Sequence, residues 1–144
     1  MRRSTFMAAI LMLLLACSPG KQAVSGKETA APATPLYGTK WSLKKIHTET
    51  GTEEALTKAF IRFDQEKNSA GGNGSCNGFG STATVNNNEV SFANIFSTKM
   101  YCEGVQKTED SFFKQLGKVN RFEIVENKLA LYQDKELLLE FASE

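Results

Sequence analysis

The sequence predicts an α+β domain, in which a curled, mostly antiparallel β-sheet packs against one α-helix. About six to eight short strands are expected, in an arrangement similar to an open barrel. Three observations predict this fold. Short runs of alternating apolar and polar residues recur from residue 39 to residue 142, as expected of half-buried strands. Turn-forming residues such as Asn and Asp separate these runs. A single segment, residues 108–117, instead has apolar residues at helical spacing.

The first half of the domain is expected to supply several strands. Residues 41–46 and 59–64 each alternate between the two faces of a strand, and the polar residues 51–58 between them are predicted to form a loop. The run Asn86–Asn88 predicts a tight turn between two further strands, because Asn tolerates positive φ. Alternation resumes over residues 98–102, which predicts another strand whose even-numbered residues point inward.

The segment 108–117 predicts the helix. Thr108 is the expected N-cap, and Glu109 and Asp110 in the first turn would complement the positive end of the helix dipole. Gly117 suits the C′ position. The apolar face has the spacing of a helix that packs on a core, so this interpretation is favoured over an exposed binding patch. That face consists of Phe112, Phe113 and Leu116.

A three-stranded meander is predicted after the helix. Apolar residues alternate with mostly polar ones within residues 122–124, 129–131 and 137–141. The pairs Glu126-Asn127 and Asp134-Lys135 supply the two turns between these strands. The meander is therefore expected to complete the same sheet and to add its apolar residues to one core.

Residues 1–16 are predicted to be a lipoprotein signal peptide. Two arginines give a basic start, and residues 6–15 form an apolar run shorter than the about 20 residues that span a bilayer. The run ends in residues 14–17, Leu-Leu-Ala-Cys, which resemble the bacterial lipobox. Cys17 is therefore expected to carry the lipid anchor, and Ser18 after it favours the outer membrane. The alternative is an ordinary secretory signal with an incidental cysteine.

Residues 17–37 are predicted to be the lipidated cysteine and a flexible tether, and residues 38–144 the folded domain. The tether contains all three prolines of the chain and has no apolar periodicity. The whole chain has 17 Lys and Arg against 16 Asp and Glu, and removal of the signal peptide takes away two arginines. Because the mature chain is nearly neutral, no nucleic-acid partner is predicted. Contact with the membrane is expected through the lipid anchor on Cys17.

Cys76 and Cys102 are the two remaining thiols if Cys17 is lipidated. In an exported protein a disulfide between them is the favoured interpretation. A metal site or a nucleophilic thiol is the alternative, and either would have only His47 as an imidazole partner. We expect His47 to be a surface residue, because no acid, nucleophile or second ligand is placed beside it by the sequence. No catalytic residue, metal or cofactor is therefore predicted.

Two short motifs, residues 76–79 (C-N-x-F) and 98–102 (T-x-M-x-C), resemble those of the META/HslJ-like domain family. The resemblance covers about residues 38–142 and also includes the pattern W-x-L at the first strand. It implies a bacterial envelope lipoprotein or exported protein. The family is linked loosely to stress response, antibiotic tolerance and motility, without an established biochemical activity. The residues that carry the motif are Trp41, Asn77, Phe79, Thr98 and Met100.

The favoured function is that of a non-enzymatic envelope lipoprotein, which binds another envelope protein at an exposed strand edge and serves as a binding or stress-tolerance module. The alternative is a carrier that holds a small apolar ligand in the curled sheet, beside Phe112 or Phe113. An open apolar cleft of about 300 Å³ or more would favour the carrier, and a filled interior would disfavour it. A hydrolase would need a cluster of buried acids with shifted pKa values in a cleft.

Overall fold

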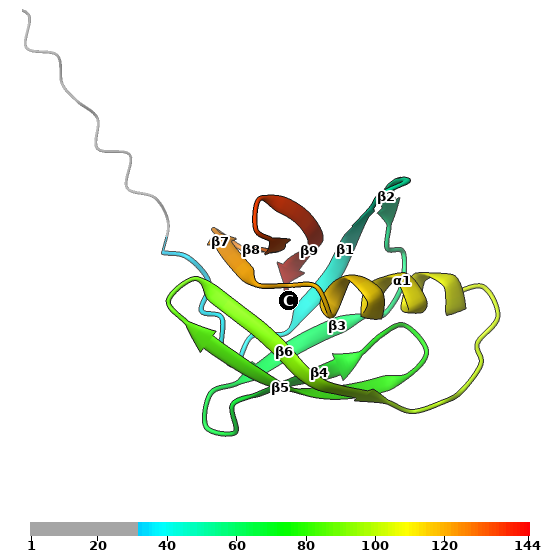
Figure 1. Cartoon of the computed structure of the whole chain (residues 1–144), viewed down its shortest axis with the longest axis horizontal. Coiled ribbons are helices and arrows are strands. Elements are labelled where there is room, and N and C mark those ends of the chain that lie inside the picture. The colour runs from blue at the N-terminus through cyan, green and yellow to red at the C-terminus, as the bar shows by residue number, and fades with distance from the viewer. Residues whose placement is uncertain (1–31) are drawn as a thin grey trace, which may run out of the picture.

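A computed structural model describes residues 32–144; the predicted signal peptide, Cys17 and most of the tether lie outside the described residues. Within residues 32–144, nine strands form a single curled sheet and one helix lies beside it (Figure 1). The strand order is β2-β1-β3-β4-β5-β6-β7-β8-β9, every pairing is antiparallel, and β1 also pairs with β9. The predicted fold class is confirmed, with more strands than expected. The elements are β1 (Trp41–Thr48), β2 (Gly51–Glu54), β3 (Phe60–Asp64), β4 (Ser69–Asn73), β5 (Gly78–Asn86), β6 (Glu89–Ser97), α1 (Gln106–Leu116), β7 (Arg121–Val125), β8 (Lys128–Gln133) and β9 (Glu136–Ser143).

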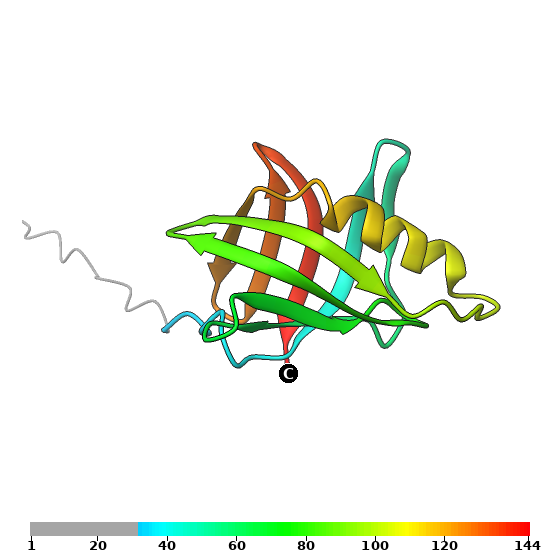
Figure 2. The ribbon, with the colours of Figure 1, turned by 60° about the horizontal axis from the view of Figure 1, so that its bottom comes forward.

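The core lies inside the curl of the sheet, and α1 supplies part of it. Phe112 has no exposed area, and its ring packs edge-on against Phe79 at 5.5 Å and Phe141 at 6.5 Å. Leu116, one turn further on, is also fully buried, and α1 packs against β1 and β9 (Figure 2). The prediction that this helix faces the core is confirmed. Phe113 is only partly buried at the edge of the core.

A bulge in β1 alters the alternation expected there. The pairing of β1 with β9 shifts register between Leu43 and Lys45. A bulge adds one residue to the strand and re-aims the side chains after it. Trp41, Leu43 and Ile46 are therefore all buried, although the strict alternation had placed Ile46 on the opposite face from the other two.

Two segments differ from their predicted structure. Residues 51–54 form β2, an edge strand paired with β1, where a loop was expected. A strand at a solvated edge needs no apolar alternation, so its polar sequence gives no strand pattern. The strand predicted at residues 98–102 is wrong, because β6 ends at Ser97 and a loop follows. The backbone N–H and C=O of Met100 bond to the side chain of Asn77, so they do not pair with a strand.

The N-cap predicted for α1 is also wrong. The helix begins at Gln106, and its N-cap is Val105, which makes no side-chain capping bond. The reason is that the backbone N–H of Glu109 already bonds to the carbonyl of Val105, which places Thr108 inside the first turn. At the other end Gly117 caps the helix with φ −67°, a right-handed conformation and not the left-handed one expected of a C′ glycine.

Contacts of the domain begin before residue 38, the predicted boundary. Leu36 is buried, and its carbonyl accepts a hydrogen bond of 3.0 Å from the indole N–H of Trp41. The backbone N–H of Thr34 bonds to the carbonyl of Glu126. Residues 34–37 are thus part of the folded unit, because the side chain of Leu36 is buried in the hydrophobic core. Within residues 32–144, no helix has the length and apolar character needed to cross a membrane.

Candidate functional site

The side chain of Asn77 lies at the centre of a buried polar network. Its Oδ1 accepts hydrogen bonds from Thr98 Oγ1 at 2.7 Å and from the backbone N–H of Met100 at 2.8 Å. Its Nδ2 donates to the backbone carbonyl of Met100 at 2.9 Å and to Glu109 Oε1 at 2.6 Å. An amide side chain can accept two such bonds and donate two, so Asn77 is fully satisfied. It joins the turn before β5, the loop after β6 and the helix α1.

Glu109 of α1 holds the same turn from the helix side. Its side chain is buried, and Oε2 accepts hydrogen bonds from the backbone N–H groups of Cys76 at 2.9 Å and Asn77 at 2.6 Å. Burial alone would raise the pKa of this carboxyl. The bonds from the Asn77 side chain and from the two N–H groups, with Lys99 nearby, outweigh burial and hold the pKa of Glu109 below its ordinary value. Glu109 is therefore an ionised structural anchor.

Cys76 and Cys102 adjoin this network and are joined by a disulfide. Their Cα atoms lie 5.8 Å apart, within the range of about 4.4–6.8 Å for disulfides. Cys102 was expected on the inner face of a strand. It lies instead in the loop after β6, where it is partly buried. The disulfide and Asn77 thus connect the same two segments of chain. A bonded pair offers no thiolate, which the metal-site and nucleophile alternatives would require.

Gly74, in the turn before β5, packs directly against α1. A Cβ atom there would lie 2.6 Å from the ring of Phe113 and 3.0 Å from Glu109 Oε2. We expect Gly74→Ala to lower the free energy of unfolding by about 1–3 kcal/mol through overpacking. Gly78→Ala is the matched control, because a Cβ there would have its nearest neighbour at 3.8 Å. Urea denaturation compares the two variants, and equal losses would contradict this account.

The other motif residues divide between the core and the surface. Trp41 is fully buried, and Phe79 packs its ring edge-on against Phe112 and Phe113. The side chain of Met100, in contrast, is 58% exposed, although its backbone is fixed. The motif therefore mainly specifies the fold, and Met100 is the motif residue whose side chain is free for contacts.

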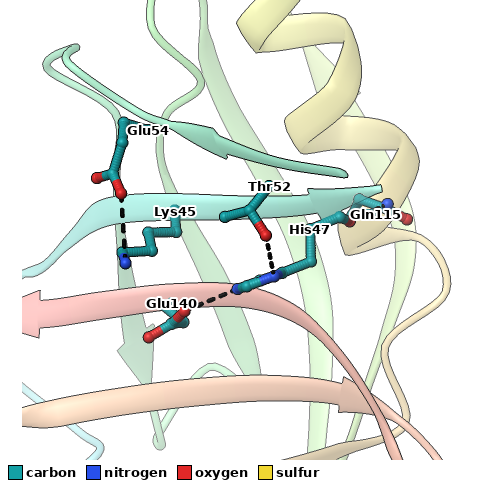
Figure 3. Close-up of polar contacts among 6 residues, drawn as sticks. All are labelled: Lys45, His47, Thr52, Glu54, Gln115 and Glu140. Atoms are coloured by element: carbon teal, nitrogen blue, oxygen red, sulfur yellow. Dashed lines mark hydrogen bonds and ion pairs between the residues drawn. The ribbon is translucent and has the colours of Figure 1, made fainter. Parts of the chain in front are cut away.

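His47, expected to be a surface residue, is partly buried and has side-chain partners on two other strands (Figure 3). Its Nε2 lies 2.7 Å from Glu140 Oε1 on β9, and its Nδ1 lies 2.9 Å from Thr52 Oγ1 on β2. Gln115 of α1 donates a hydrogen bond to the backbone carbonyl of His47. The carboxylate is 93 residues away in the chain, and Thr52 falls in a segment predicted to be a loop. No local sequence pattern brings these groups together.

A hydroxyl, an imidazole and a carboxylate in a row are also the parts of a nucleophilic site. Catalysis would further require a cleft that holds a substrate against the nucleophile. The depression between the β1–β2 turn and α1, about 210 Å³ in volume, is not lined by His47 or Thr52. We interpret the cluster as a contact that ties β1 to β2 and β9. Within residues 32–144, no three His, Cys, Asp or Glu side chains are grouped to hold a metal ion.

The fold and the Asn77 network define a small disulfide-containing α+β domain, in which a curled antiparallel sheet is joined to one helix by buried polar contacts. The chain belongs to the META domain family, whose family model matches residues 34–144. The C-N-x-F and T-x-M-x-C motifs of the sequence are thus the two segments that Asn77 and the disulfide connect.

Two solved structures share the fold. A protein from Burkholderia xenovorans, solved by NMR, aligns with a TM-score of 0.63 at 18% sequence identity and covers 90% of this chain and 99% of its own. A second protein solved by NMR aligns with a TM-score of 0.56 at 19% identity and covers 74% of this chain and 91% of its own. No curated protein shows significant sequence similarity to the chain. At these identities the likeness concerns the fold alone.

Proposed function

We propose that the protein is a lipid-anchored protein of the bacterial envelope, at the outer membrane, and that it acts by binding another envelope protein without catalysing a reaction. The lipobox-like sequence at residues 14–17 supports the anchor. The resemblance to the META/HslJ-like family supports the envelope and a role in stress tolerance. The domain itself would then act as the binding module at the end of a short tether.

The observation that carries the binding role is a group of exposed apolar side chains on adjoining loops. Leu56 is 93% exposed, Met100 58% and Tyr101 79%. The disulfide joins the loop of Met100 and Tyr101 to the turn before β5. Ser75 in that turn donates a hydrogen bond of 3.0 Å to Thr57, beside Leu56. Large apolar groups that are exposed on a rigid frame are typical of a surface for a partner.

The carrier of an apolar ligand has less support. The interior beside Phe112 is filled by packed rings. A depression of about 560 Å³ lies where the β5–β6 hairpin meets β7. Seven of its eight lining residues are polar or charged, whereas ligand pockets for apolar molecules are lined mainly by apolar side chains. The residues lining it are Thr84, Asn86, Glu89, Val90, Ser91, Asn120, Arg121 and Asp134.

The absence of catalysis is supported by the role of Glu109. It is a buried acid with a shifted pKa, which is the kind of group that often marks an active site. The hydrogen bonds of its carboxylate, however, go to the turn before β5, through Cys76 and Asn77. Its environment is therefore explained by the fold, and no substrate is needed to account for it.

The anchor is tested by comparing the wild-type chain with Cys17→Ser in its native host. The wild type should incorporate an acyl-chain probe and remain in the membrane fraction, because two or more acyl chains give stable attachment. Cys17→Ser should take up no probe and be released or remain unprocessed. Equal labelling of the two proteins would contradict the anchor.

Binding is tested by chemical cross-linking in intact cells, followed by purification of the anchored chain. One envelope protein should be recovered reproducibly with the wild type, and much less of it with Cys17→Ser, which no longer brings the domain to the membrane. Recovery of the anchored chain without any cross-linked protein would contradict the binding role.

A further inference from the structure

The outer edge of β6 lacks a strand partner along most of its length. β6 pairs with β5 from end to end, but it pairs with β7 only where Glu89 meets Arg121. Beyond that pair, no other strand of the described chain lies along this edge. The helix α1 packs on β1 and β9, and β6 continues into the loop at residues 98–101 beside α1 (Figure 2). Such an edge offers its backbone N–H and C=O groups to an added strand.

The sequence of this edge is open to pairing. Residues 90–97, Val-Ser-Phe-Ala-Asn-Ile-Phe-Ser, contain no charged residue, proline or glycine. Edge strands are commonly protected by lysine, by proline or by being very short, whereas β6 has nine residues. Its one protective feature is a bulge at Asn94, which has φ 51° and interrupts the edge near its middle. An uncharged strand can therefore align with β6 without burying an unpaired charge.

Exposed apolar side chains lie at the C-terminal end of the β6 edge, next to a groove beside α1. Phe96 is 70% exposed, and Met100 and Tyr101 are the next large apolar groups along the chain, both exposed. The groove, about 320 Å³ in volume, lies between residues 97–101 and α1. Gln106 of α1 lines it, and the Oε1 atom of Gln106 is buried without a hydrogen-bond partner among the described residues. Lys99, Glu109 and Asp110 also line the groove, which thus combines an apolar rim with a polar and charged wall.

We propose that residues 90–101, here called the β6 docking edge, bind an extended, uncharged segment of another envelope protein as an added strand. The backbone of that segment would pair with β6, and apolar side chains at one of its ends would cover Phe96, Met100 and Tyr101. Strand addition combines main-chain hydrogen bonds for affinity with side-chain contacts for specificity. The inference rests on the proposed function and specifies the kind of partner and the surface it meets.

A second copy of the chain fits this edge less well. Two copies related by a twofold axis would pair their β6 strands in antiparallel orientation. The loop of Met100 and Tyr101 in one copy would then face the β5–β6 turn of the other. That turn, residues 86–89, is Asn-Asn-Asn-Glu. The exposed apolar side chains would meet a polar surface and stay uncovered, so a partner with an apolar end is the better occupant.

The surface is tested with the full lipidated chain in its native host, carrying the photo-cross-linking residue p-benzoylphenylalanine in place of Phe96 or of Tyr101. Val125 on β7 is the matched control, because it is also a large apolar residue with 65% exposure. We expect Phe96 and Tyr101 to cross-link to one protein, within one contiguous uncharged segment located by mass spectrometry. Val125 should cross-link to it weakly or not at all.

Strand addition itself is tested with a synthetic peptide of the cross-linked segment. Its binding to the purified full chain should slow amide hydrogen exchange within residues 92–97 by about tenfold or more. Methylating alternate backbone nitrogens of the peptide, on the side that faces β6, should abolish this protection, whereas methylation on the other side should preserve it. Binding that is indifferent to both patterns would overturn strand addition.

The outcomes separate this proposal from the proposed function. If only Val125 cross-links to a protein, the proposed binding function is retained and the β6 docking edge is overturned. Cross-links from Phe96 and Tyr101 to lipid or to a second copy would overturn the proposed occupant. If no position cross-links to any protein, and chemical cross-linking also recovers none, both proposals fail.

Discussion

Asn77→Ala is expected to lower the free energy of unfolding by about 3–4 kcal/mol, because it removes four hydrogen bonds, one of them to an ionised carboxylate. The backbone N–H and C=O of Met100 would lose their partner, and Glu109 would keep its charge with one fewer donor. Leaving buried groups unsatisfied costs more than the net value of the bonds themselves. Urea denaturation of the purified, oxidised protein measures the loss.

Asn86→Ala is the control for this prediction. Asn86 is the same residue type at an exposed position at the end of β5. Surface substitutions of this kind change stability by less than about 0.5 kcal/mol. Similar losses in Asn77→Ala and Asn86→Ala would contradict the central role of the Asn77 network.

The same network predicts a pH dependence through Glu109. The pKa of Glu109 in the folded state lies below the ordinary value of 4.5. As the pH falls past 4.5, this group therefore binds a proton more readily in the unfolded chain than in the folded chain. The contribution of Glu109 is therefore complete above about pH 4.5 and is lost as the pH falls through its folded-state pKa. Glu109→Gln should be less stable than the wild type at pH 7, and this difference should narrow below about pH 4.5. A difference that stays constant with pH would contradict an ionised Glu109.

Removing the disulfide is the second large effect expected. Cys76→Ser and Cys102→Ser should each lower the free energy of unfolding by about 2–5 kcal/mol, because the bond closes a loop between positions 26 residues apart. The double variant should lose little more than either single variant, since either change breaks the same bond. Urea denaturation of the three variants measures these losses. Thiol counting on the unfolded, unreduced wild type should find no free thiol at these positions, and two free thiols or fully additive losses would contradict the bond.

The disulfide and the Asn77 network act on the same segments, so their losses should not be independent. Both connect the turn before β5 to the loop of residues 98–102. If the disulfide restrains this loop when Asn77 is replaced, the combined loss of Asn77→Ala and Cys102→Ser should differ from the sum of the single losses. The sign of that difference tells whether the two connections support each other or substitute for each other.

Several elements of this fold were determined by the local sequence. The meander of β7, β8 and β9 follows from apolar alternation broken at residues 126–127 and 134–135, and Glu126 and Asp134 adopt the positive φ that tight turns require. The β5–β6 turn at Asn87, also with positive φ, is of the same kind. The inward face of α1 follows from the helical spacing of Phe112 and Leu116. In each case the signal and the structure lie within a few residues of one another.

Only the tertiary structure decided the polar contacts. Residues 98–102 alternate like a strand, yet they form a loop because Asn77, more than twenty residues earlier, takes the backbone groups of Met100 that pairing would use. The position of Glu109 in the first turn of α1 suggests a residue that complements the helix dipole. Its side chain instead accepts hydrogen bonds from the turn at Cys76 and Asn77. Periodicity reports which side of an element is buried, because burial repeats along the element. A hydrogen bond between distant residues has no period, so it becomes visible only when the chain is folded.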